Sequence, residues 1–67
     1  MNAGQVEDLL IHMLVNRGAT RDETTGIMLL LQTPQEQWEL VKWLAENRAA
    51  TMQEIIQTTL DIQAKKT

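Results

Sequence analysis

Residues 16–23 read Asn-Arg-Gly-Ala-Thr-Arg-Asp-Glu, and residues 47–54, which begin 31 positions later, read Asn-Arg-Ala-Ala-Thr-Met-Gln-Glu. In both copies an apolar stretch with helical spacing leads into the junction, and Thr-x-x-Glu opens the next stretch. Thr-x-x-Glu is typical of a capping box, in which the two side chains accept hydrogen bonds from free N–H groups at a helix start. The repeat therefore predicts an all-α fold of four short helices, arranged as two tandem antiparallel αα-hairpins in a compact small bundle.

Other local signals place the helix ends. Thr33 and Glu36 form a third capping box, and Pro34 occupies the first helical position, where no N–H is needed. Gly18 is positioned to adopt the left-handed conformation that ends a helix. The apolar run at 27–31 is rich in Leu and has no second strand to pair with, so helix is favoured over strand. Within a single domain covering residues 1–67, the expected helices lie at about 3–16, 21–32, 34–47 and 52–64.

Apolar residues recur three and four positions apart, a spacing that places them on one side of a helix. We expect these stripes to form the core, because helices joined by short loops pack as neighbours. A chain of 67 residues buries only a small core, so it needs good packing or a partner. The stripes are Val6, Leu9, Leu10, Met13 and Leu14 in the first helix, Trp38, Val41, Leu44 and Ala45 in the third, and Met52, Ile55, Ile56, Thr59 and Leu60 in the fourth.

The charge distribution argues against nucleic acid and membrane surfaces as partners. The net charge is −3, and residues 1–64 hold nine carboxylates against four basic side chains. Phosphate backbones and anionic lipids attract the opposite balance. The apolar run at 9–15 is too short to span a bilayer, and the chain contains no cysteine. These features predict a cytoplasmic protein without membrane association.

The sequence contains no recognisable catalytic or metal-binding constellation. His12 is the single histidine, and Asp8, four residues earlier, is its nearest candidate partner. One histidine cannot assemble a metal site without several carboxylates. No hydroxyl lies in a nucleophile turn, and Gly4, Gly18 and Gly26 are too far apart for a phosphate-binding loop. The sequence therefore predicts a non-enzymatic protein with no cofactor and no metal.

Apolar side chains outside the stripes form the predicted interface. Trp43 lies on the side of its helix opposite the stripe, and Leu40 lies between Trp43 and the core. Ile11, His12 and Val15 form a second patch on the first helix. Exposed aromatic and aliphatic groups together mark partner sites, so these five residues are expected to bind another protein or a second copy of the chain. Trp43→Ala is then expected to disrupt association and to leave the helix content intact.

Structural explanations of the same residues stay open. The helix at 3–16 would then be central, covered by the second and fourth helices, and Trp43 would lie flat over a loop. Arg17 and Arg48 occupy matched positions in the two junctions and also allow two interpretations. They are a pair of anion contacts, or they interact with the C-terminal carbonyl groups of the first and third helices. The second interpretation is favoured, because helix C-termini attract cations.

The segment from Leu44 to Ile56 resembles the first two helices of a bacterial helix-turn-helix unit, in which Leu-x-x-Asn leads through a small-residue turn into Ala-Thr-x-x-Glu-Ile. In that family a third helix reads the major groove of DNA. The resemblance implies, as an alternative function, a DNA-binding or transcription-associated protein. After the first junction the reading helix would be 34–47, whose leading turns hold Glu36 and Glu39 and would repel phosphates. As a whole, the chain resembles small acidic all-helical bacterial proteins of unknown function.

Overall fold

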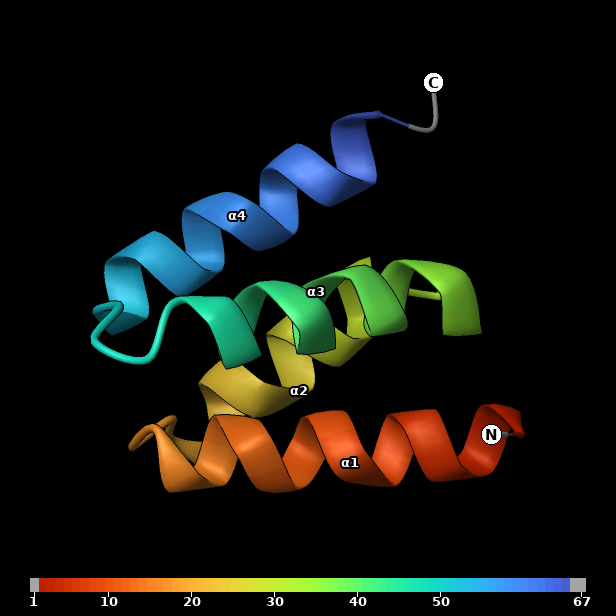
Figure 1. Ribbon diagram of the computed structural model, residues 1–67, viewed down its shortest axis with the longest axis horizontal. Helices are drawn as coiled ribbons and strands as arrows, with labels where there is room; N and C mark the ends of the chain where they lie inside the picture. Colours follow the sequence, from red (N-terminus) through yellow and green to blue (C-terminus); the bar gives the residue numbers. More distant parts are fainter. Residues whose placement is uncertain (1, 66–67) are drawn as a thin grey trace.

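Four α-helices account for most of residues 2–65, the part of the chain that the computed structural model describes, and no strand occurs among these residues (Figure 1). The prediction of an all-α fold with four helices is therefore confirmed for this part of the chain. The second helix ends two residues earlier than expected and the third ends one residue earlier. In chain order the helices are α1 (Ala3–Asn16), α2 (Arg21–Leu30), α3 (Pro34–Glu46) and α4 (Met52–Ala64).

Every helix begins at a capping box. Thr20, Thr33 and Thr51 are the N-caps of α2, α3 and α4, and each side chain accepts a hydrogen bond from the N–H of the Glu three residues on. The Glu side chain accepts a hydrogen bond from the Thr N–H in return, which confirms these three predicted starts. A fourth box, made by Asn2 and Gln5, begins α1 and was not predicted. Each cap stabilises its helix by roughly 1 kcal/mol.

The two junctions of the repeat end their helices in different ways. After α1, Gly18 has a φ of +88°, the left-handed conformation predicted for it. Ala49 occupies the matching position after α3, and no residue other than glycine has a positive φ within residues 2–65. A Cβ atom makes that conformation costly. The last turn of α3 is completed instead by Asn47, whose Nδ2 donates a 2.8 Å hydrogen bond to the main-chain oxygen of Trp43.

The helices form a closed ring around the core, in which each helix packs mainly against two others. α3 lies between α1 and α4, and α2 lies behind them, in contact with α1 and α4 (Figure 1). The most extensive contact joins α1 to α3 rather than to α2. The alternative in which α2 and α4 cover a central α1 is therefore wrong. The arrangement as two tandem hairpins stays a prediction.

The core receives apolar side chains from all four helices and from the residue after α2. The stripe predicted in α1 faces inward, because all five of its residues are buried or pack partly buried against the core. In α4 the prediction was wrong at Leu60, which is 41% exposed, whereas Ile62 takes the inner position. The buried apolar residues are Val6, Leu10, Leu14, Ile27, Leu31, Leu40, Val41, Leu44, Ile55 and Ile62.

The stripe predicted in α3 is confirmed for its two middle members, which are buried in the core, and wrong for its two end members. Trp38 is 40% exposed and Ala45 is exposed, whereas Gln37 and Leu40 are buried. Gln37 tolerates burial because its Nε2 donates a 2.9 Å hydrogen bond to the main-chain oxygen of Leu31. The buried face of α3 is set by two neighbours, α1 and α4. The residue pattern of one helix does not reveal where those neighbours lie.

Candidate functional site

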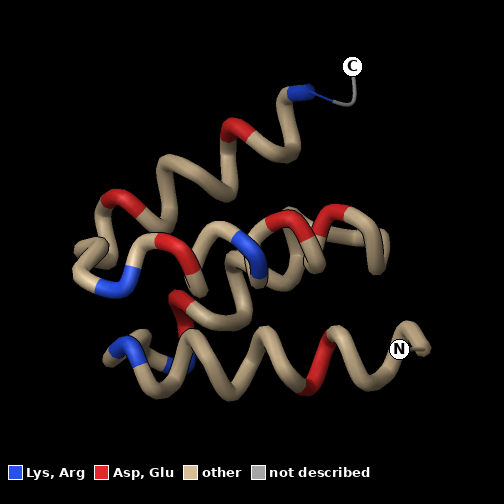
Figure 2. The backbone as a smooth tube through the Cα atoms, in the orientation of Figure 1, with Lys and Arg blue, Asp and Glu red and all other residues tan. Residues whose placement is uncertain are grey.

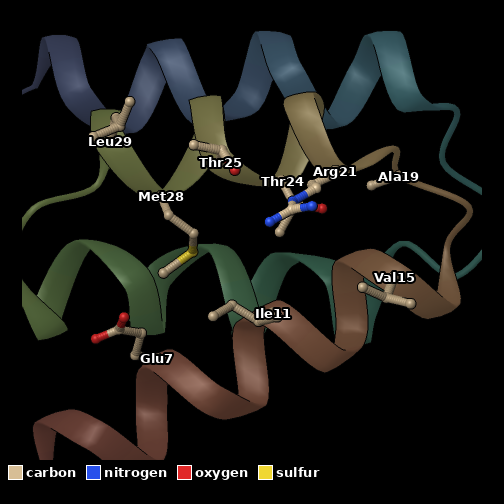
Figure 3. Close-up of a pocket in the computed structure, with 9 residues that line it drawn as sticks. All are labelled: Glu7, Ile11, Val15, Ala19, Arg21, Thr24, Thr25, Met28 and Leu29. Carbon is tan, nitrogen blue, oxygen red and sulfur yellow. The ribbon is translucent and has the colours of Figure 1, made fainter.

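A groove of about 740 Å³ runs between α1 and α2 at the surface of the molecule (Figure 3). Its apolar lining comes from both helices: α1 contributes Ile11 and Val15, and α2 contributes Met28 and Leu29. We call this feature the α1/α2 groove. Its complete lining consists of Glu7, Ile11, Val15, Ala19, Arg21, Thr24, Thr25, Met28 and Leu29.

The groove exists because both helices carry more apolar side chains than one helix face can bury. In α1, Glu7, Ile11 and Val15 follow one another at four-residue intervals, so they share one line beside the buried stripe. At the end of α2, five apolar residues run together from Ile27 to Leu31, and a helix turns by about 100° per residue. Only some members of such a run can face the core. The others face solvent or a partner.

Two side chains of the groove protrude into solvent. Leu29 is 67% exposed and Val15 is 58% exposed, the largest values among the large apolar residues at positions 2–65. Ile11 and Met28 are half-buried between them, and Met28 packs against the core. Single exposed apolar residues are normal, whereas these four apolar residues lie together and come from two helices.

The structure brings together two of the three residues that were predicted as a patch on α1. Ile11 and Val15 line the groove, whereas His12 does not. His12 is exposed, and its Nδ1 lies 2.8 Å from the main-chain oxygen of Asp8. Because a carbonyl oxygen only accepts, Nδ1 donates in this hydrogen bond. The contact uses the main chain of Asp8 and not its carboxylate, so the two side chains do not form an acid–base pair.

The other two predicted interface residues do not form an exposed surface. Leu40 is 0% exposed and belongs to the core, so its assignment to an interface is corrected. Trp43 is half-buried and packs against the same core. Its remaining surface lines a depression of about 430 Å³ between α3 and α4, together with charged residues such as Lys42 and Asp61. Trp43 therefore lies apart from the α1/α2 groove.

The arginines of the two junctions lie at one end of the molecule. Arg17 and Arg48 line the same depression, and Figure 2 shows basic segments gathered where the junctions lie. The guanidinium of Arg17 donates hydrogen bonds to the main-chain oxygens of Asn47 and Leu44, at the C-terminal end of α3. The structural interpretation of Arg17 is therefore confirmed, although the carbonyl groups belong to α3 and not to its own helix. Arg48 is exposed.

The described residues show neither a metal site nor a membrane-spanning helix. Residues 2–65 hold no group of three or more His, Cys, Asp or Glu side chains placed to bind a metal ion. No helix in that part of the chain has the length and apolar character needed to cross a membrane. Comparisons with protein-family models, curated proteins and solved structures gave no match. The resemblances seen in the sequence stay predictions, and the α1/α2 groove is the feature from which a function is inferred.

Proposed function

We propose that the protein is a non-enzymatic helical module that binds another protein chain through the α1/α2 groove. The observation that supports this proposal is the contiguous apolar lining from two helices, with Leu29 and Val15 as its most exposed members. Interfaces place apolar side chains at the centre of a patch and charged ones at its rim. We also place the module in the cytoplasm, where a chain without cysteine has no disulfide to lose.

A groove between two helices suits a helical partner. The side chains of a docking helix form ridges that pack into such a groove, and an amphipathic helix supplies apolar residues every three or four positions. The DNA-binding alternative has less support. α3, which would have to enter the major groove, packs against α1 and α4, and its leading turns carry Glu39 and no basic side chain before Lys42. Glu36 is buried in the capping box, so it does not add to this argument as the sequence suggested.

Site-specific photocrosslinking in the native cells tests this proposal. A photoactivatable amino acid replaces Leu29 in one variant and Leu60 in a matched control, because Leu60 is also exposed but lies on α4 outside the groove. We expect a covalent adduct with a protein chain from position 29 and little or none from position 60. Adding Val15→Glu, which puts a charge into the groove, is expected to abolish the adduct.

Circular dichroism of the purified variants establishes that they fold, so that a missing adduct reports on binding. Equal adducts from positions 29 and 60 would mean that the groove is no preferred contact. No adduct from position 29 would contradict the proposed function. An adduct that survives Val15→Glu would place the contact elsewhere on the surface.

A further inference from the structure

The charges at the rim of the α1/α2 groove differ in sign. Glu7 comes from the first half of α1, on the side of the groove where Leu29 lies, and Arg21 comes from the start of α2 (Figure 3). Both charged side chains are exposed, and neither has an ion-pair partner within residues 2–65. The other seven lining residues are uncharged. The groove is therefore neutral, although the chain carries a net charge of −3.

This arrangement is complementary to itself. In an isologous dimer the same patch on two copies meets across a two-fold axis. If one residue of the first copy contacts a second residue in the other copy, the same pair also meets with the copies exchanged. In Figure 3, the line from Leu29 on α2 to Ile11 on α1 passes between Glu7 on one side and Arg21 on the other. A two-fold axis in the plane of this face, running along that line, exchanges the acidic and the basic side of the groove. Glu7 of each copy then faces Arg21 of the other.

On the basis of the proposed function, we propose that the chain docked in the groove is a second copy of this protein. Two ion pairs between Glu7 and Arg21 flank an apolar centre, in which Leu29 and Ile11 meet their own counterparts near the axis. Stable interfaces bury about 800 Å² per partner, which is roughly a sixth of the 4548 Å² accessible surface. The whole face of α1 and α2 therefore takes part. A second copy extends the small core of this chain, and the groove itself brings no net charge against its counterpart.

The mass in solution and a pair of charge reversals test the dimer. Size-exclusion chromatography with light scattering, over a roughly hundredfold concentration range at low salt, is expected to show a mass that rises from 7.6 kDa toward twice that value. Glu7→Arg and Arg21→Glu each convert two attractions into two repulsions. We expect each variant alone to raise the dimer Kd about tenfold. Mixing the two variants is expected to restore dimerisation, because every facing pair in the mixed dimer again has opposite charges.

The matched control is Glu46→Arg, which makes the same charge change on α3, outside the groove, and is expected to dimerise like the wild type. Circular dichroism establishes the helix content of every variant. A mixture that dimerises no better than its separate components would overturn the two-fold arrangement. A mass of 7.6 kDa at every concentration would overturn the dimer. If position 29 then crosslinks to a different protein, the proposed function holds and the second copy as partner is refuted.

Discussion

The guanidinium of Arg17 donates a 2.9 Å hydrogen bond to the main-chain oxygen of Asn47, and a second hydrogen bond goes to the main-chain oxygen of Leu44. The last carbonyl groups of a helix lack intrahelical donors and carry the negative end of the helix dipole. The residue that follows α1 therefore caps α3. This contact joins the two copies of the repeated junction, which are far apart in the sequence.

Arg17→Ala is expected to lower the free energy of unfolding by about 2 kcal/mol, because it removes a charged donor from two partly buried carbonyl groups. Arg48→Ala is the matched control, since Arg48 occupies the same position in the second junction and is exposed. The control is expected to change stability by less than about 0.5 kcal/mol. Urea unfolding followed by circular dichroism measures both values. Equal losses would show that the hydrogen bonds of Arg17 add no stability.

Gln37→Glu is expected to destabilise the fold by about 2–3 kcal/mol, because an ionised carboxylate cannot donate to the Leu31 carbonyl and would itself be buried. Gln35→Glu makes the same chemical change two residues earlier, at an exposed position in the first turn of α3. A carboxylate there interacts favourably with the helix dipole, so stability is expected to stay equal or to rise slightly. Urea unfolding at neutral pH separates the two variants. Similar effects from both would refute a structural role for the Gln37 amide.

Gly18→Ala and Gly26→Ala are expected to change stability in opposite directions. A Cβ built on either residue meets no atom within 4 Å, so only the backbone conformation distinguishes them. At Gly18 the positive φ makes alanine strained, which costs about 1 kcal/mol. Gly26 lies inside α2, where alanine is the better helix former by about 1 kcal/mol. Thermal unfolding should therefore give a lower Tm for Gly18→Ala and a higher Tm for Gly26→Ala. A rise in Tm for both would contradict the left-handed conformation at residue 18.

Part of the stability is expected to depend on pH through Glu54. Hydrogen bonds from Thr51, first from its main chain and then from its side chain, lower the pKa of the Glu54 carboxyl below its ordinary value of 4.5. Between the lowered pKa of the folded chain and about pH 4.5, the unfolded chain therefore binds more protons at Glu54 than the folded chain does. The free energy of unfolding consequently rises with pH across this range. This contribution is present above about pH 4.5 and is lost as the pH falls through the folded pKa. Urea midpoints of wild type and Glu54→Gln, measured from neutral to acidic pH, should converge as the pH falls. A constant difference over that range would show that Glu54 contributes nothing through its charge.

Trp43→Ala is expected to lower the free energy of unfolding by about 2–3 kcal/mol, because the indole packs against the core. Trp38→Ala, on the same helix but at a residue that is 40% exposed, is expected to cost about 1 kcal/mol. Neither substitution touches the α1/α2 groove. Under conditions where both variants stay folded, light scattering should show wild-type association. A variant at Trp43 with full stability but no association would restore this residue to the interface.

The lining of the α1/α2 groove could be predicted from the sequence only in part. Ile11 and Val15 were predicted as a surface patch because they share one line of a helix outside the buried stripe. Met28 and Leu29 were not predicted, although the apolar run to which they belong was visible. Which members of that run face outward depends on how α2 packs against α1 and α4. The same dependence explains Leu40, which was placed between Trp43 and the core and assigned to the interface, and which the packing of α3 places in the core.

By itself, the sequence determined that the described fold is all-α and where α2, α3 and α4 begin. It did so because a capping box and the apolar spacing of a helix act between residues one turn apart. Only the tertiary structure decided which face of α3 is buried, which helix Arg17 caps, and where the apolar residues of α1 and α2 meet in a groove. Each of these depends on pairs that are distant along the chain, such as Arg17 and Asn47, which are 30 positions apart. Such pairs meet only when the helices pack, and helix packing is set by the shapes of all four helices together.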